Sequence, residues 1–391
     1  MHRSTTDRGR AALCGLLCSA IILAASGLAP DNQPAPTAAG LPDDIAQALR
    51  HNAAALSPLS ISWETKFRTD LPVAEAVRIG QFPEKSSFFD PRTVKFSRQD
   101  GKFSYLRKMG GSRRGARFSH RYDGVNLYQG TGSEEDGFST LIFVFGPEQV
   151  KKSSMFVYES EYFDRAGFKL YGTMETLQKP DEAMILYLLG RGAKLTSDNL
   201  TRVEGSYCRN IELTSEWGRH QFYLDPALNY ALRKYVDLTA DGRTKRVTTN
   251  REFVEFPAQK IWLPRESSSA WHTWSSMKGK VRDSPLVYED IRADHLDKSP
   301  MPDKTFVMDM KRPTTIVADT RLPGAEKQKG GFIEYQVPAD LEYLDGVIEA
   351  ATKGKKFVPP LPDNRRTKVI IALNVVILSA GVVFLWNRAK R

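Results

Sequence analysis

The fold is decided by residues 218–264, which read GRHQFYLDPALNYALRKYVDLTADGRTKRVTTNREFVEFPAQKIWLP. Apolar and polar residues alternate with a period of two through this stretch, as they do in strands that bury one face. Asp241-Gly242 interrupts the alternation with a dipeptide that suits the positive φ angles of a tight hairpin turn. The stretch therefore predicts consecutive antiparallel strands joined by short turns.

The same pattern extends beyond this stretch on both sides. Alternation begins at Ser60, and further hairpin turns are expected at Asp100-Gly101 and Asp123-Gly124. Before residue 323, helical spacing is found over 44–55 and 180–190. Roughly nine to eleven strands with so few helices predict a mainly β (α+β) fold. We expect a large curved antiparallel sheet, or an unclosed β-barrel, wrapped over one or two helices and covering residues 41–322.

Residues 1–30 have the composition of a targeting segment. Arg3, Arg8 and Arg10 precede an uncharged, apolar run over 11–28, which is typical of a secretory signal peptide. The run is also about long enough to cross a bilayer, so an uncleaved N-terminal anchor is the alternative. A linker rich in Pro and Ala follows over 31–40.

The other end of the chain predicts a membrane span. Residues 369–386 carry no charge and are flanked by basic residues on both sides, which is typical of a transmembrane helix. A basic cytoplasmic tail would follow over 387–391. A stalk over 323–368, with a short helix at 340–351 and a Pro-rich spacer, would precede the span. We therefore expect a single-pass protein of the cell membrane, with most of the chain on the extracytoplasmic (periplasmic) side.

The net charge of +10 suggests a nucleic-acid partner until its distribution is considered. Residues 1–30 carry +2 and residues 365–391 carry +6, which leaves +2 for the 334 residues between them. The domain is nearly neutral and is expected outside the cytoplasm. A nucleic-acid partner is therefore not expected.

The order of several short segments resembles a known family. An early Trp on a strand is followed by a strand that ends in Asp-Pro, by a hairpin and by a Trp-Leu-Pro segment. The segments are Trp63, Tyr223-Leu224-Asp225-Pro226, Leu232-Arg233-Lys234, Trp262-Leu263-Pro264 and Thr315-Ile316-Val317-Ala318-Asp319. Over about residues 41–322 the chain is similar to the outer-membrane lipoprotein-sorting proteins, the LolA/LolB-like superfamily with the RseB-type sensors.

The resemblance implies an unclosed antiparallel barrel around helices, with an apolar cavity that takes acyl chains. Carriers of that family are soluble or lipid-anchored, whereas a transmembrane helix is expected here. A receptor, a sensor or a stationary scaffold is therefore a more natural expectation than a shuttle.

The sequence contains no pattern typical of an active site. The histidines after residue 30 are far apart and match no metal-binding motif, so neither a metal nor another cofactor is expected. Ser267-Ser268-Ser269 beside His272 is either a reactive cluster or the polar surface of a strand. Cys208 remains alone once a signal peptide is removed, and a small buried apolar residue is its expected role. We expect a protein that is not an enzyme.

Two sets of residues are candidates for binding. Aromatic residues on the strands would either line the hollow of the sheet or fill its core, and period-two position does not separate these roles. They are Trp63, Phe96, Phe103, Tyr105, Phe143, Phe145, Phe222 and Trp262. Seven cations with no acid among them would either contact anionic headgroups or form a solvated hairpin. They are Lys102, Arg107, Lys108, Arg113, Arg114, Arg117 and Arg121.

The leading hypothesis is a membrane-tethered, non-catalytic domain that binds a lipid or a lipidated protein in the hollow of its curved sheet. The first alternative is a protein-interaction or envelope-sensing module that acts on another membrane protein. The second is an extracytoplasmic hydrolase whose site is assembled from residues distant in the sequence.

Overall fold

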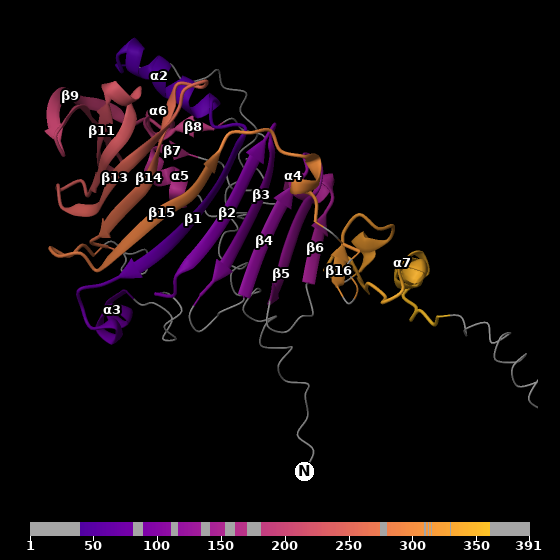
Figure 1. Cartoon of the computed structure of the whole chain (residues 1–391). Helices are drawn as coiled ribbons and strands as arrows, with labels where there is room; N and C mark the ends of the chain where they lie inside the picture. Colours follow the sequence, from indigo (N-terminus) through magenta and orange to yellow (C-terminus); the bar gives the residue numbers. More distant parts are fainter. Residues whose placement is uncertain are drawn as a thin grey trace, which may run out of the picture.

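The computed structural model describes residues 40–80, 89–110, 116–133, 141–152, 161–169, 181–273, 280–308, 310–311, 313, 315–328 and 330–359. Within these ranges one mixed, mostly antiparallel sheet of 15 strands dominates, in the order β17-β16-β6-β5-β4-β3-β2-β1-β15-β14-β13-β12-β11-β10-β9. Strands β16 and β6 pair in parallel, and the first and last strands of this order do not meet. The expected large, unclosed sheet is confirmed (Figure 1).

The strands fall into two runs that join where β1 pairs with β15. The first run is β1 (Leu59–Arg68), β2 (Arg92–Gln99), β3 (Lys102–Met109), β4 (Ala116–Tyr122), β5 (Leu127–Ser133) and β6 (Leu141–Phe145). The second is β9 (Lys194–Val203), β10 (Ser206–Ser215), β11 (Gly218–Asp225), β12 (Ala231–Leu238), β13 (Thr244–Phe256), β14 (Ile261–Trp271) and β15 (Val287–Asp297). The short strands are β7 (Phe168–Lys169), β8 (Glu182–Ala183), β16 (Ile316–Asp319) and β17 (Ile333–Gln336).

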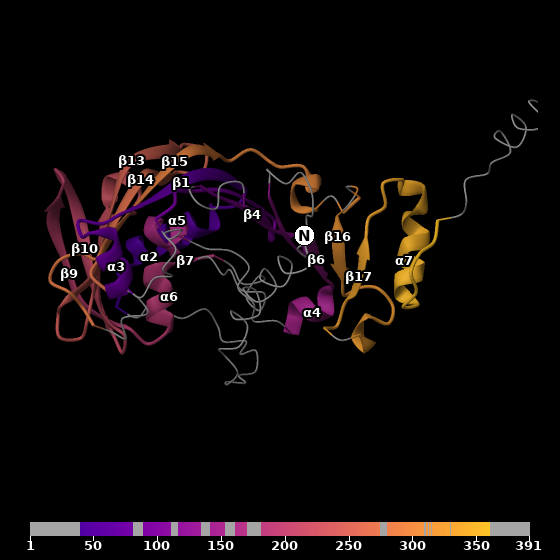
Figure 2. The same ribbon diagram turned by 90° about the horizontal axis from the view of Figure 1, so that it is seen from below.

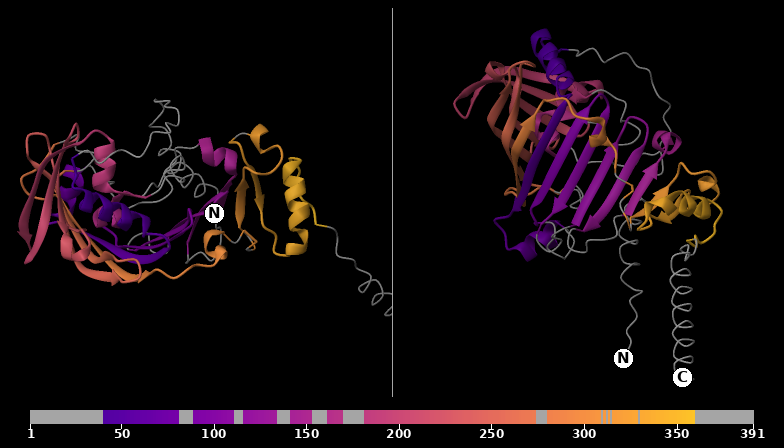
Figure 3. Two further views of the ribbon diagram at one scale, coloured as in Figure 1. Left: turned by 90° about the horizontal axis from the view of Figure 1, so that it is seen from above. Right: turned by 45° about the vertical axis from the view of Figure 1, so that its right-hand side comes forward.

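The described helices are all short. They are α2 (Asp43–Ala54), α3 (Val73–Gly80), α4 (Pro147–Lys152), α5 (Glu161–Ala166), α6 (Met184–Gly190) and α7 (Leu344–Thr352). Short 3-10 turns cover Pro226–Leu228, Asp303–Phe306, Ala325–Lys327 and Leu341–Tyr343. The sheet curves, and α2, α5 and α6 lie on its concave side (Figures 2 and 3). The two helices expected from the sequence are therefore present, and α5 joins them inside the hollow.

Helix α5 is fixed to the concave face by aromatic and polar contacts together. The ring of Tyr162 lies 5.7 Å from that of Trp63 on β1, and the Phe163 ring lies 5.1 Å from that of Phe96 on β2. The Tyr162 hydroxyl donates to the backbone oxygen of Pro264 on β14 at 2.7 Å. These contacts make α5 part of the hydrophobic core, where it covers the strands around the β1–β15 junction.

A buried ion pair completes the attachment of α5. Arg165 pairs with Glu289 on β15, and their side chains are only 3% and 4% exposed. The Arg165 guanidinium also donates to the backbone oxygen of Glu289 at 3.2 Å, and the indole N–H of Trp271 donates to its carboxylate at 3.0 Å. Asn250 on β13 donates to the backbone oxygen of Arg165 at 2.7 Å. The buried charges of Arg165 and Glu289 are therefore compensated by each other and by further hydrogen bonds.

The connection from β15 to β16 crosses the outer side of the first run of strands. Met308 packs there with Tyr128, Ile142 and Val144, and the backbone N–H of Met301 donates to Gln99 at 2.6 Å. The structure differs here from the expected stalk over 323–368. Strand β17 extends the sheet, and α7 packs against the cluster that contains Val317, because its apolar residues complete that cluster.

The expectation of a single-pass membrane protein is wrong for the described part of the chain, where no helix is both long and apolar enough to cross a membrane. The longest helix in these ranges, α2, has 12 residues. At about 1.5 Å per residue it spans roughly 18 Å, against about 30 Å for a bilayer core. The expectations of a signal peptide, a transmembrane helix and a basic tail rest on the segments 1–30 and 369–391. Both segments lie outside the described residues.

Candidate functional site

Four of the aromatic candidates are core residues around α5. Trp63, Phe96, Phe103 and Tyr105 are buried in one cluster, which also contains Tyr162 and Phe163. The alternation of β1, β2 and β3 points these side chains to the concave face, where the rings of α5 contact Trp63 and Phe96. In the described structure they fill a core.

Phe222 and Trp262 have different surroundings. Phe222 is buried in a second cluster, which α2 and α6 form with β10, β11 and β12. The pocket beside it has a volume of about 10 Å³, roughly the space of one water molecule. Trp262 is half-buried and alternates along β14 with the buried residues Ile261 and Leu263, so it lies on the outer face.

Phe143 and Phe145 on β6 are half-buried rings on the concave side. They stack with 6.3 Å between their centroids, and Phe145 packs against the edge of the α5 cluster. The Phe332 ring meets Phe143 edge to face at 5.9 Å. Among the aromatic candidates, this pair combines a concave position with incomplete burial.

The basic candidates are divided between the two faces of β3 and β4. Lys102 pairs with Asp303 at 2.6 Å, and Arg121 donates to the backbone oxygen of Val307 at 2.6 Å, so the outer crossing connection holds both. Arg107 lies over the Phe118 ring at 5.0 Å, on the opposite face from its neighbour Lys108. The backbones of Lys108 and Arg117 are partners in the ladder, whereas Arg113 and Arg114 lie outside the described residues.

The outer face of the second run carries a ladder of alternating charge. The register places Arg251, Glu266, Arg292 and Glu64 side by side on four neighbouring strands. Arg292 pairs with Glu266 at 3.3 Å, and Arg251 pairs with Glu204 at the end of the row. The four residues of the row, without Glu204, line a shallow groove of about 360 Å³. Because opposite charges already face one another, the groove presents no strong field of either sign.

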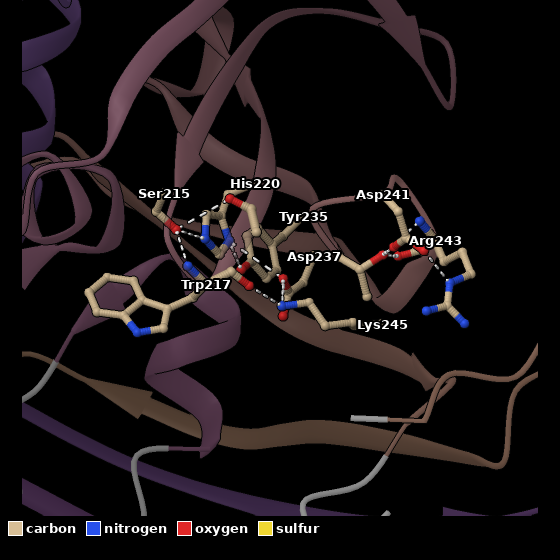
Figure 4. A network of polar contacts seen from close by, with 10 residues as sticks. Ser215, Trp217, His220, Tyr235, Asp237, Asp241, Arg243 and Lys245 are labelled. Carbon is tan, nitrogen blue, oxygen red and sulfur yellow. Dashed lines mark hydrogen bonds and ion pairs between the residues drawn. The ribbon is translucent and has the colours of Figure 1, made fainter. Parts of the chain in front are cut away.

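A polar network lies near the turn between β10 and β11 (Figure 4), and its His220 is on the same face of β11 as the buried Phe222. The Ser215 hydroxyl is 3.2 Å from Nε2 of His220. Nδ1 of His220 is 2.9 Å from the Tyr235 hydroxyl and 3.6 Å from Oδ1 of Asp237. Lys245 is 2.9 Å from the same Asp237 oxygen and donates to the backbone oxygen of Trp217 at 2.9 Å.

The sequence did not single out this network, because its members come from β10, β11, β12 and β13. The register explains the assembly: His220 pairs directly with Asp237, and Ser215 pairs with Gly218 across a two-residue turn. Gly218 has a φ of +132°, and a Cβ added there would lie 2.1 Å from the backbone oxygen of Leu238. The turn therefore packs against β12 in a way that only glycine permits.

The serine cluster suspected from the sequence is not an assembled site. Ser269 hydrogen-bonds to Thr248 at 2.7 Å, Ser268 donates to Asp290 at 2.5 Å, and His272 contacts the backbone oxygen of Arg282 at 3.0 Å.

Cys208 is buried, and its burial raises the pKa of the thiol to about 11. Within the described ranges no three His, Cys, Asp or Glu side chains are placed to share a metal ion.

No family model matches the chain, and no curated protein matches its sequence. Three similar solved structures illustrate the fold. A domain described as an outer membrane lipoprotein-sorting protein from Vibrio parahaemolyticus has 12% identity and a TM-score of 0.37, over 67% of this chain and 94% of its own. A LolA superfamily protein from Nitrosomonas europaea has 12% identity and a TM-score of 0.35, over 68% and 98%. A chain of the Pseudomonas aeruginosa MucA/MucB complex has 10% identity and a TM-score of 0.23, over 67% and 95%.

The chain resembles these proteins. The weak match expected from the sequence is thereby confirmed. At such low identities and TM-scores the likeness says nothing about the ligand or the mechanism of this chain.

His220 should make the stability of the fold depend on pH. Burial lowers its pKa, with Lys245 and Arg246 acting in the same direction and Asp237 opposing them. The unfolded chain, with a His pKa near 6.5, therefore binds a proton at a pH where the folded chain does not. We expect the free energy of unfolding to fall as the pH drops through about 6.5 and this contribution to level off below the folded-state pKa.

Urea denaturation at several pH values between 8 and 5 measures this effect. Because other groups titrate in the same range, the quantity of interest is the difference between the wild type and His220→Gln. The variant should show a shallower loss of stability on acidification. Parallel curves for the two proteins would contradict the assignment.

Proposed function

We propose that this protein is a binding module that takes up an apolar ligand, an acyl chain or the lipid-modified part of a protein, in the hollow of its curved sheet. The observation that supports the proposal is the stacked pair Phe143 and Phe145, which lies on the concave side and is only half-buried. Apolar surface that the core leaves exposed inside a concave face is what an acyl chain would cover.

The rest of the sheet is less suited to such a ligand. Around α5 the aromatic side chains are already buried, and a ligand there would have to displace the contacts of Tyr162, Phe163 and Arg165. The outer groove is lined by paired charges, which an acyl chain would strip of water without compensation. The β5–β6 end of the concave face is therefore our proposed contact region.

Replacing Phe143 by serine should weaken binding of a dansyl-labelled fatty acid by about two- to fivefold. Full burial of such a side chain contributes about 1.5–3 kcal/mol, and because Phe143 is already half-buried, the ligand would cover only about a third of it. Fluorescence titration of the purified full-length chain measures the dissociation constant, and mass spectrometry under native conditions detects any lipid that purifies with it.

Trp262→Ser is the matched control, because this aromatic residue is also half-buried but lies on the outer face. It should leave the dissociation constant unchanged. Equal weakening by both variants, or no binding by the wild type, would reject a site at Phe143.

A second function, a protein-interaction module, is favoured by a separate feature. Strand β9 ends the described sheet, and the β9–β10 hairpin carries Leu200 and Tyr207, which are 67% and 71% exposed. A partner segment could add to this edge through backbone hydrogen bonds and cover both side chains. A photocrosslinker at Leu200 should then give a discrete protein adduct that one at Lys66, on the outer face, does not give.

A further inference from the structure

We propose that Ser215 and His220 form a nucleophile–base pair that cleaves carboxylic esters at the β10–β11 turn. This activity goes beyond the proposed binding function and rests on different residues. It requires three things of the structure: a hydroxyl within reach of an imidazole, a group that orients the imidazole, and access from solvent.

The first requirement is met by the contact of 3.2 Å between the Ser215 hydroxyl and Nε2 of His220. The two residues lie on neighbouring strands and on one face, because Ser215 pairs with Gly218 and Leu213 pairs with His220. The turn places them diagonally across the hairpin. A neutral imidazole with a free lone pair on Nε2 can accept the serine proton from this position.

The second requirement concerns the proton on the other ring nitrogen. Nδ1 faces the Tyr235 hydroxyl and the Asp237 carboxylate, at 2.9 and 3.6 Å. The nearby negative charge favours a proton on Nδ1, which leaves Nε2 as the acceptor facing Ser215. Asp237 is a positioning residue in this scheme.

Lys245 links the Asp237 carboxylate to the β10–β11 turn, because it pairs with Asp237 and also donates to the backbone oxygen of Trp217. Asp237 is thus held between Lys245 and the imidazole. The charged groups that face the ring are Asp237, Lys245 and Arg246, and burial keeps the ring unprotonated near neutral pH. A base has to be in that state to act.

The third requirement is access. Ser215 is half-buried at the tip of the hairpin, whereas His220 is almost fully buried behind it. Trp217, in the same turn, is 48% exposed and offers an apolar surface beside the hydroxyl. Its backbone N–H lies 3.2 Å from the serine oxygen and is a nearby donor for a developing oxyanion. An ester with an apolar acyl group fits this combination.

The reaction balances without a cofactor. The serine oxygen bonds to the ester carbonyl carbon while its proton moves to Nε2 of His220. The bond from that carbon to the alcohol oxygen then breaks, and the alcohol leaves with the proton from Nε2. Water adds to the acyl-serine with His220 again taking a proton, and the carboxylic acid leaves as the serine hydroxyl is restored.

The structure also gives Ser215 an ordinary role, since its hydroxyl is 3.3 Å from the backbone oxygen of Gly218 and accepts from the N–H of Trp217. The experiment has to separate closure of the turn from catalysis. A fluorophosphonate probe does so, because it reacts with serines that a neighbouring base activates and leaves ordinary turn serines unmodified.

Incubation of the purified full-length chain with the probe, followed by peptide mass spectrometry, should find the adduct on Ser215. His220→Gln should slow the labelling at least tenfold, and Ser206→Ala, on the same strand, should leave it unchanged. Asp237→Asn should shift the pH profile of p-nitrophenyl butyrate hydrolysis, which mere closure of the turn would not. No adduct on Ser215, or a labelling rate independent of His220, overturns the proposal.

A second variant avoids changing the buried histidine. In Ser215→Cys the introduced thiol lies beside His220, so its pH midpoint for alkylation by iodoacetamide should lie well below the value of about 8.5 for a free cysteine. A midpoint of about 8.5 or above would show that His220 does not activate this position, and would also overturn the proposal.

Discussion

Replacing Glu289 by glutamine should lower the free energy of unfolding by about 3–5 kcal/mol. Glu289 and Arg165 are almost fully buried, and the carboxylate also accepts from the indole N–H of Trp271. Glutamine has nearly the same shape but no charge, so the guanidinium would remain in the core without its partner. Equilibrium denaturation in urea, read by fluorescence and circular dichroism, measures the loss.

Arg292→Gln is the matched control for this prediction. It breaks the pair with Glu266 on the same sheet, but those side chains are 65% and 36% exposed. Exposed pairs contribute about 0–1 kcal/mol, so this variant should be nearly as stable as the wild type. Similar losses for the two variants would mean that the Arg165–Glu289 pair is not held in a dry core.

Trp63→Ala should cost about 3–5 kcal/mol, the range typical of a large aromatic residue removed from a core. Trp63 is fully buried between the sheet and α5, with the Tyr162 and Phe163 rings 5.7 and 6.3 Å away. Its removal leaves a cavity that the short helix cannot fill without breaking the hydrogen bond from Tyr162 to Pro264. Thermal and urea denaturation measure the effect.

The control here is Trp217→Ala, which removes the same side chain from a position that is 48% exposed. Surface substitutions of this kind usually change stability by about 0.5 kcal/mol or less. A small loss at Trp63 would show instead that α5 is held loosely and that the hollow beneath it can open. That outcome would move the proposed ligand site toward the centre of the sheet.

The two candidate sites lie in different parts of the concave face. Phe143 belongs to β6 in the first run of strands, and His220 belongs to β11 in the second. The α5 cluster lies on the strands around the β1–β15 junction between them. Binding at the first site and ester cleavage at the second can therefore be tested separately, since variants in one do not touch the other.

Local patterns were enough to predict the sheet. Alternation around Asp241-Gly242 led to β12, β13 and β14, and the Asp-Gly turns at Asp100 and Asp123 led to the strands on either side of them. Such patterns work because a strand with one buried face repeats every two residues and a tight turn needs particular residues. The parallel pairing of β16 with β6 has no local signal, since it joins segments about 170 residues apart.

Helix α5 was missed for a similar reason. Its sequence, EYFDRA, is too short for helical periodicity to be recognised, and Arg165 reads as a surface residue until Glu289 is known to lie opposite. In the structure the aromatic candidates lie on the concave face of their strands, except for Trp262, which lies on the outer face. Helix α5 decides whether these side chains line a cavity or fill a core, and the sequence did not reveal this helix.

The sequence by itself determined the class of fold, the approximate strands, two of the helices in the hollow and the weak resemblance to lipoprotein-sorting proteins. Each follows from periodicity, turn residues or the order of short segments. Only the tertiary structure decided which aromatic rings stay exposed, where the cations pair, and that Ser215, His220 and Asp237 meet. Those outcomes depend on register and on contacts between distant segments, and a linear pattern carries no information about either.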